Sequence, residues 1–309
     1  MSQPALETRE LRKNYRRIEA LRGVSLRVDQ GEIYGLLGQN GAGKTTLIKI
    51  LLGIARGWTG SANLLGLPAG KTDVRRRVGY LPEDHHFPDY HSAFSLLDFY
   101  GQLLSVPRRT RHARIPVVLD LVGLTERMHY KIRGYSKGMK QRVGIAQALL
   151  HEPDIIFLDE PTDGVDPLGR KEIRGIMQRL KEQGTTIFLN SHLLGEVELI
   201  CDRVGILQKG RMVREGDVAT LTKQKGRFLL GLAPGQNLPV ADLQAMGYDT
   251  VPYGDRWELF LTEDQSIDPV VDWVRSRGLS LRHLVEKRQS LEDLFVQILE
   301  DDPERSERR

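Results

Sequence analysis

The chain has 309 residues, of which 40% are apolar and 28% charged, and 45 basic residues against 41 acidic ones give a formal net charge of +4. This length accommodates one large domain, or one large and one small, and the balanced, scattered charge does not favour a nucleic-acid partner. The only cysteine, Cys201, excludes an internal disulfide and fits a reducing compartment.

Strand and helix patterns alternate along the first two thirds of the chain. Residues 5–37 predict short strands with a turn at 29–31, and residues 44–52 predict a helix. The pattern becomes helical between about residues 91 and 150, most clearly at 95–104, 115–121 and 139–150. Strands return at 155–158, 186–189 and 204–207. This alternation predicts an α/β fold with a mostly parallel sheet and a helical insertion.

The last third of the chain has a pattern of its own. Its segments 226–232, 240–246, 256–261, 269–277, 279–285 and 291–299 are interpreted as β-α-β-α-β-α. We therefore expect a large α/β domain over 1–222, with a helical subdomain at about 91–150, and a small α/β domain over 223–300. Residues 301–309 contain no apolar side chain and predict a disordered tail.

A phosphate-binding loop, Gly38-Gln39-Asn40-Gly41-Ala42-Gly43-Lys44-Thr45, lies between the apolar strand 32–37 and the helix 44–52. Its glycines let backbone N–H groups turn inward around a phosphate, and the helix adds its positive end. Lys44 is expected to reach the β- and γ-phosphates, Thr45 to ligate Mg²⁺ and Thr46 to contact the α-phosphate. The candidate ATP-binding residues here are Gly38, Asn40, Gly41, Ala42, Gly43, Lys44, Thr45 and Thr46.

Two acidic residues, Asp159 and Glu160, follow the apolar strand 155–158. Open α/β sheets bind ligands at the carboxyl ends of their strands. Asp159 is therefore expected to hold Mg²⁺, and Glu160 to polarise the attacking water as the catalytic base. Either residue alone would fit a helix cap or a surface acid, but the pair after four apolar residues favours catalysis.

Two further strings carry a family resemblance: Tyr135-Ser136-Lys137-Gly138-Met139-Lys140-Gln141-Arg142 and Phe157-Leu158-Asp159-Glu160-Pro161. With the phosphate loop upstream, the set resembles the ATP-binding-cassette (ABC) ATPases over roughly residues 5 to 220. The family pattern Leu-Ser-Gly-Gly-Gln is altered here at three of its five positions. The resemblance implies that Ser136 and Gly138 cap the γ-phosphate of an ATP held by a second subunit.

The resemblance implies roles for four more residues. His192 matches the histidine that contacts the γ-phosphate, and Asp166 matches the loop that crosses the dimer interface. Tyr15 matches an adenine-stacking aromatic residue, although a plain strand tyrosine fits as well. Glu83 stands where the family usually has a glutamine that ligates Mg²⁺, and its carboxylate adds a charge beside Glu160. His85, His86 and His91 lack metal-ligand spacing and predict a solvated loop instead.

The function implied by the resemblance is an ATP-hydrolysing subunit that forms a homodimer on ATP and drives an integral-membrane permease. No run of about 18 apolar residues is present, so a membrane role requires a separate partner, with this chain peripheral on the cytoplasmic face. The small C-terminal domain and the segment 290–295, Ser-Leu-Glu-Asp-Leu-Phe, resemble those of type-2 exporters. The alternatives are a non-transport mechanical ATPase acting on a soluble or nucleic-acid partner, and a nucleotide-gated module without turnover. Glu160 and His192 argue against the latter.

Overall fold

The computed structural model describes residues 3–262 and 264–300, and the chain forms two compact units, Met1–Val218 and Ala219–Arg309. The division falls at the first residue of the short helix α8 (Val218–Leu221), four residues before the expected boundary at 222. The predicted tail 301–309 lies outside the described residues. Within the described residues, no helix is long and apolar enough to cross a bilayer.

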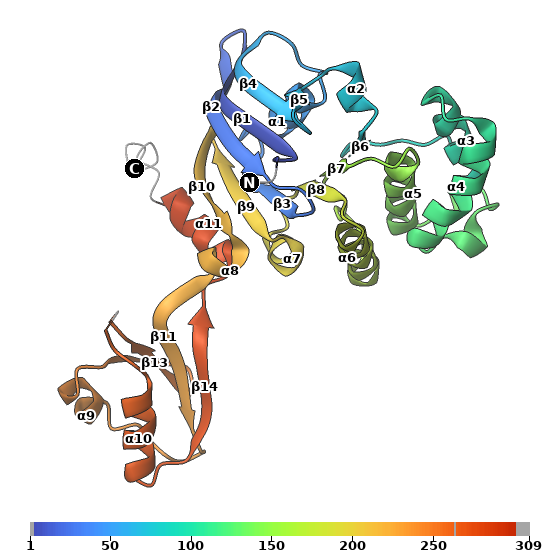
Figure 1. The fold of residues 1–309 in the computed structure, drawn as a ribbon. Helices are drawn as coiled ribbons and strands as arrows, with labels where there is room; N and C mark the ends of the chain where they lie inside the picture. Colours follow the sequence, from blue (N-terminus) through green and yellow to red (C-terminus); the bar gives the residue numbers. More distant parts are fainter. Residues whose placement is uncertain (1–2, 263, 301–309) are drawn as a thin grey trace. The chain divides into compact units, whose positions relative to one another are not determined.

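A six-stranded sheet forms the centre of the first unit (Figure 1). In spatial order its strands are β10 (Arg211–Asp217), β9 (Arg203–Gln208), β3 (Ile33–Leu37), β8 (Thr186–Asn190), β7 (Ile155–Asp159) and β6 (Val78–Leu81). All neighbours are parallel except β10, which runs antiparallel to β9. Every residue of β3, β7 and β8 is buried, as expected for a parallel sheet covered on both faces. The predicted α/β fold is confirmed.

A second, antiparallel sheet contains the amino-terminal strands. Its order is β2 (Ile18–Val28), β1 (Leu6–Tyr15), β4 (Trp58–Leu64) and β5 (Leu67–Pro68). The sequence predicted short strands here, but β1 and β2 have 10 and 11 residues. Register shifts along the hairpin interrupt the alternation of apolar residues, but the two strands remain paired. The sequence pattern therefore underestimates the length of both strands. Helix α1 (Lys44–Leu51) shares one apolar core with β1, β2 and β3.

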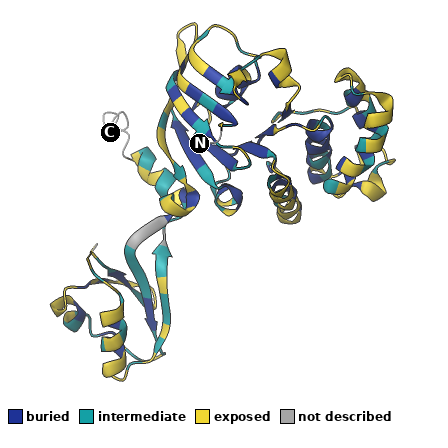
Figure 2. Cartoon of the chain, viewed as in Figure 1, coloured by how far each residue is buried: buried dark blue, intermediate teal, exposed yellow. Residues whose placement is uncertain are grey.

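Helices complete the first unit: α2 (Thr72–Arg75), α3 (Ala93–Leu103), α4 (Arg108–Leu121), α5 (Lys137–Leu149), α6 (Pro167–Glu182) and α7 (Leu194–Ile200). Short 3₁₀ turns occur at Thr125–Arg127 and Ile132–Gly134. Helix α4 begins seven residues before the predicted start at 115. The prediction missed this first part because its side chains are mostly basic and show no apolar period. Arg111 in that part is nevertheless buried, and its Nε donates to Asp98 at 2.6 Å. Figure 2 shows dark, buried faces on α5.

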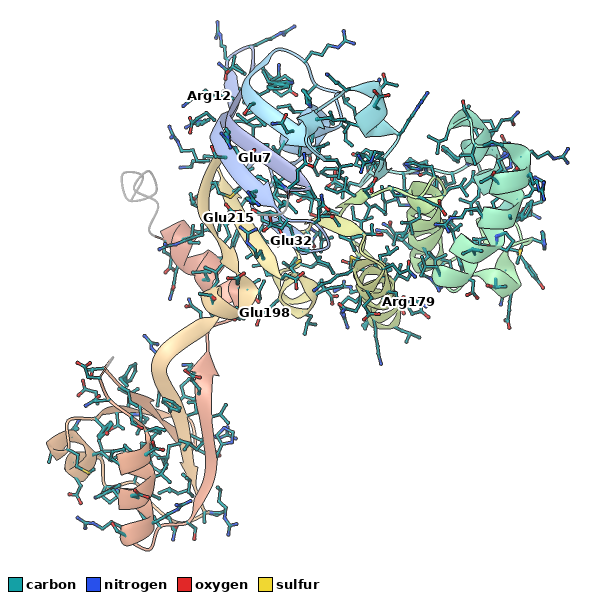
Figure 3. The ribbon with its side chains drawn as sticks, in the orientation of Figure 1. Glu7, Arg12, Glu32, Arg179, Glu198 and Glu215 are labelled. Carbon is teal, nitrogen blue, oxygen red and sulfur yellow. The ribbon has the colours of Figure 1, made fainter. Side chains whose placement is uncertain are left out.

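An ion-pair cluster joins the outer strands of the parallel sheet. Arg203 Nη1 is 3.2 Å from Glu32 Oε1 and its Nη2 is 2.9 Å from Glu215 Oε1. The hydroxyl of Tyr34 also donates to Glu215, at 3.1 Å. Figure 3 labels both carboxylates beside β3, β9 and β10. These contacts fix β9 and β10 to β3, whose carboxyl end leads into the phosphate-binding loop.

The second unit is a four-stranded antiparallel sheet with two helices between its strands. Its elements are β11 (Lys223–Leu232), α9 (Val240–Ala245), β12 (Asp249–Tyr253), β13 (Arg256–Phe260), α10 (Asp268–Ser276), β14 (Leu281–Arg288) and α11 (Leu291–Glu300). The spatial order β12-β13-β11-β14 with β-α-β-β-α-β connections is the ferredoxin-like topology. The predicted pattern missed β12, which contains Pro252 and has mostly exposed side chains.

Candidate functional site

The phosphate-binding loop is held between β2 and β9 by contacts that only glycine permits. A Cβ on Gly43 would lie 2.5 Å from the carbonyl oxygen of Ala20, and φ at Gly43 is +109°. A Cβ on Gly38 would lie 2.3 Å from the carbonyl oxygen of Leu207. The N-cap residue of helix α1 is Gly43, and no side chain within residues 3–262 and 264–300 caps this helix. The amide groups at the start of α1 are therefore available to an anion.

Lys44, the first residue of α1, is buried and folds back over this loop. Its Nζ donates to the carbonyl oxygens of Gly38 at 2.7 Å and Gln39 at 3.3 Å. Burial lowers the pKa of Lys44, and the nearby carboxylates of Glu160, Asp159 and Glu83 oppose this shift. The ammonium group therefore lies where three acidic side chains and the loop converge.

Asp159 ends β7 and is almost completely buried, at 1% exposure. Its Oδ1 accepts a hydrogen bond from Nδ2 of Asn190, which lies directly opposite in the parallel register of β8. Burial raises the pKa of Asp159, the bond from Asn190 lowers it, and the charge of Glu83 raises it. The sequence reasoning did not identify Asn190. Asn190 ends a buried strand at the same edge of the sheet, but an asparagine in that position carries no chemical signature of its own.

Glu160, the residue after β7, has a left-handed backbone with φ of +52°. Its N–H donates to the carbonyl oxygen of Asn190 at 2.9 Å. Its buried Oε2 is 2.8 Å from Nδ1 of His192 and accepts from the N–H of His192 at 3.3 Å. Burial raises the pKa of Glu160, and His192 lowers it. A strained backbone that aims one carboxylate at a half-exposed histidine is typical of a reactive site.

The donor set at this edge fits a magnesium–nucleotide complex. Lys44 and the uncapped end of α1 match phosphate oxygens, while Thr45 and Asp159 offer the hydroxyl and carboxylate oxygens that Mg²⁺ prefers beside phosphate. Glu83 is exposed, and it influences Asp159 and Lys44 through its charge. In residues 3–262 and 264–300 no group of three or more His, Cys, Asp or Glu is placed to hold a metal by itself. Phosphate oxygens would therefore complete the coordination.

A second anion-binding feature lies at the start of α5. Ser136 is the exposed N-cap residue, and its Oγ accepts from the N–H of Met139 at 3.2 Å. Gly138 is buried against the next loop, where an added Cβ would lie 3.1 Å from Cγ1 of Val165. That loop ends at Asp166, the exposed N-cap residue of α6. The structure thus brings Ser136, Gly138 and the Asp166 loop together.

The remaining candidate residues are Tyr15 on β1, three residues inside the phosphate loop, and Thr46 directly after it. Tyr15 ends β1 with 43% of its surface exposed, and its ring centroid is 4.6 Å from Nζ of Lys13. Lys13 is itself held by bonds to the carbonyl oxygens of Arg56 and Gly57. Asn40 and Gly41 are exposed, Ala42 is buried, and Thr46 is half-buried in the first turn of α1.

Two of the three imidazoles of the 85–91 loop have local partners, while the third, His86, is exposed. His85 is half-buried, contacts the carbonyl oxygen of Pro82 and packs on Phe87. His91 contacts the hydroxyl of Ser95. The prediction of a solvated loop is therefore wrong for His85 and His91, which local contacts half-bury, whereas His86 is exposed as predicted.

Known proteins resemble this chain along most of its length. Residues 21–163 match the family model described as ABC transporter. An uncharacterized ABC transporter ATP-binding protein of Synechocystis sp. strain PCC 6803 is 42% identical over 306 residues, which cover 96% of this chain and 85% of that protein. The bacitracin transport ATP-binding protein of Bacillus licheniformis is 33% identical over 300 residues, covering 95% and 97%. A solved ATP-binding subunit of an ABC transporter superposes with a TM-score of 0.63 at 31% identity, covering 70% of this chain and 91% of its own.

Proposed function

The chain belongs to the ATP-binding proteins of ABC transporters and is an ATPase, and from this premise we propose how its residues act and with what partners. We propose that two copies close on two ATP molecules, that hydrolysis separates them, and that this cycle drives a separate membrane permease in the direction of export.

Within one copy, the buried edge of the parallel sheet carries the hydrolytic chemistry. Lys44 and the amide groups of the phosphate loop bind the phosphate chain, with Lys44 ready to stabilise charge on the γ-phosphate. Thr45, Asp159 and Glu83 would hold Mg²⁺, which when bound supplies positive charge for the phosphate oxygens. Glu160 orients and deprotonates the attacking water, and His192 holds that carboxylate in place and contacts the γ-phosphate.

The observation that supports a two-copy site is the separation of the donors into two sets. The carboxylates of Asp159 and Glu160 act on Lys44, and Glu160 contacts His192. By contrast, Ser136 caps α5, and Gly138 packs against Val165 in the loop that leads to Asp166. The hydroxyl and helix end at Ser136 face solvent, so a second nucleotide held by another copy would complete this half-site. Tyr15 would stack on the adenine of its own copy.

The surface around α3, in the helical part of the first unit, is suited to docking a membrane protein. Apolar and aromatic side chains on and around α3 are exposed, which is unusual without a partner. They include Tyr90, Phe99, Leu103, Leu104 and Tyr130. The Bacillus licheniformis relative is named for bacitracin transport. We propose a permease partner on this surface, with the ATPase peripheral on the cytoplasmic face of the membrane and no nucleic-acid partner.

The test uses a hydrolysis-deficient chain. Glu160→Gln keeps the shape of the side chain but removes the base, and it should form a dimer in ATP and Mg²⁺ that sedimentation velocity detects. The same variant carrying Lys44→Ala should remain a monomer, since it lacks the buried phosphate ligand. A Glu160→Gln protein that stays monomeric in saturating ATP contradicts the two-copy mechanism. Co-purification of a membrane protein with the tagged chain tests the permease, and association with ribosomes or DNA alone contradicts it.

A further inference from the structure

Lys137, which stands between Ser136 and Gly138, lies across the loop that follows Glu160. Its Nζ is 3.1 Å from Oδ2 of Asp163. Its side chain also covers Gly164, where an added Cβ would lie 2.2 Å from Nζ and 3.1 Å from Cε of Lys137. The two charged side chains are 54% and 50% exposed. The lysine is therefore held beside the start of α5 by an ion pair that water can reach.

The loop that holds Lys137 starts at the proposed base. The N–H of Asp163 donates to the carbonyl oxygen of Glu160 at 3.2 Å, and the N–H of Val165 donates to that of Thr162 at 3.2 Å. One compact turn therefore connects Glu160, which acts on the nucleotide of its own copy, with the residues that would cap the nucleotide of the other copy. Lys137 lies where this turn meets α5.

We propose that Lys137 is a further phosphate-binding residue, which exchanges Asp163 for the γ-phosphate held by the second copy when the two copies close. This inference rests on the proposed two-copy function. Ser136 and Gly138 flank the lysine in sequence and would bring the phosphate to the same helix end. An exposed ion pair is weak, whereas an ammonium–phosphate bond in a closed interface is charge-assisted and shielded from water. The exchange is therefore favourable.

The exchange has a distinctive consequence, because Asp163 competes with the phosphate for one ammonium group. Removing the lysine should weaken the ATP-bound dimer, whereas removing the charge of Asp163 should strengthen it. An ion pair that only stabilised the fold would behave differently: either change would weaken the dimer or leave it unaltered. The two explanations thus differ in the sign of one effect.

The experiment measures the dimer dissociation constant in ATP and Mg²⁺ by sedimentation equilibrium, with Glu160→Gln present in every protein. Lys137→Met should raise this constant about tenfold, because each dimer loses two charge-assisted contacts. Asp163→Asn should lower it about two- to fivefold, the range for an exposed ion pair. In the double variant, Asp163→Asn should have no further effect. Lys140→Met removes the same charge from the same helix and should change the constant by less than about twofold.

Two results would overturn the inference. One is an unchanged dissociation constant for Lys137→Met, and the other is an Asp163→Asn effect that is as large without Lys137 as with it. Thermal melting of each variant shows whether the fold has been retained. A Glu160→Gln parent that forms no dimer would instead contradict the proposed function, and it would remove this inference with it.

Discussion

The carboxyl edge of the parallel sheet and the start of α5 both offer donors to phosphate, but they are built in opposite ways. At the sheet edge, Lys44, Asp159 and Glu160 are buried, and the charges of both carboxylates act on Lys44. At the start of α5, Ser136 and Lys137 are exposed. The hydroxyl of Ser136 accepts from the N–H of Met139, and the ammonium group of Lys137 pairs with the carboxylate of Asp163.

This difference indicates which half of the proposed two-copy site would be complete in a single chain. Buried charged groups are costly to move or leave unpaired, so the sheet edge is fixed before any nucleotide arrives. The exposed groups at α5 gain little until another surface excludes water from them. Changes at the sheet edge should therefore affect every assay of the single chain, whereas changes at α5 should affect mainly the closed pair.

The largest effect is expected from Glu160→Gln. Losing a positioned base should lower the turnover number by about 10²- to 10⁴-fold, because general base catalysis typically contributes that much. ATP affinity should be retained, since the glutamine oxygen still accepts from the N–H of His192. Phosphate release and equilibrium nucleotide binding measure the two quantities. Glu32→Gln, a matched change of a carboxylate bonded to Arg203, should leave turnover unaltered. Wild-type turnover in Glu160→Gln would show that Glu160 is not the base, and the buried sheet edge would lose its proposed catalytic role.

The second largest effect is expected from Lys44→Ala, which should weaken ATP binding by about 10- to 150-fold. This is the range expected for losing a charge-assisted contact of about 1.5–3 kcal/mol. The variant also leaves the carbonyl oxygens of Gly38 and Gln39 without the lysine. Titration with a fluorescent ATP analogue measures the affinity. Lys49→Ala, on the exposed side of the same helix, serves as the control and should retain binding. Unchanged affinity in Lys44→Ala would exclude this loop as the phosphate site.

Asn190→Leu should weaken the binding of Mg²⁺ and leave the contacts to the nucleotide unaltered. Nδ2 of Asn190 donates to Asp159, while its buried Oδ1 has no hydrogen-bond partner among the described residues. Losing the donor raises the pKa of Asp159 further and leaves its orientation less fixed. The Mg²⁺ concentration for half-maximal turnover should rise about tenfold, the lower range for a residue that supports a metal ligand. An unaltered Mg²⁺ requirement would show that Asp159 does not hold the metal through this geometry.

Asn190 also shows where sequence reasoning reached its limit. Glycine, lysine and acidic residues carry recognisable chemistry, and the ends of parallel strands must meet at one edge, so the convergence of Lys44, Asp159 and Glu160 could be predicted. An asparagine at a strand end has no such signature, and only the register of β7 against β8 places it opposite Asp159.

The fold shows the same division between what local pattern reveals and what only contacts reveal. Buried strands such as β3 and β7 were predicted, because most of their residues are apolar. The first half of α4 and the strand β12 were missed, because basic side chains in one and Pro252 in the other conceal the period. The contact of Lys137 with the Asp163 loop joins distant residues and has no sequence signal at all.

His192→Ala should lower turnover about fivefold, the effect of losing one hydrogen bond of about 1 kcal/mol, and should change its pH dependence. Burial raises the pKa of Glu160 above its ordinary value, and His192 lowers it. Activity needs the carboxylate, so it is lost as pH falls through the pKa of Glu160. Removing His192 raises that pKa further, and the acid limb of the profile should move to higher pH. The same change at His112, which contacts Asp98, should leave the profile in place. A shift to lower pH would contradict the contact with Glu160.

The smallest effect on the single chain is expected at Ser136, and it separates the two halves of the comparison. Ser136→Ala loses the cap on α5, which should cost about 1 kcal/mol and lower the Tm by about 2–4 °C. Ser136→Asp keeps a capping oxygen and should retain the Tm, yet it places a negative charge toward the partner's phosphate. In the Glu160→Gln background, Ser136→Asp should therefore abolish the ATP-dependent dimer although it is the more stable variant, while nucleotide binding by the single chain stays unaltered in both. If dimer strength instead followed Tm, the start of α5 would be a structural cap alone, and the contrast with the sheet edge would lose its functional meaning.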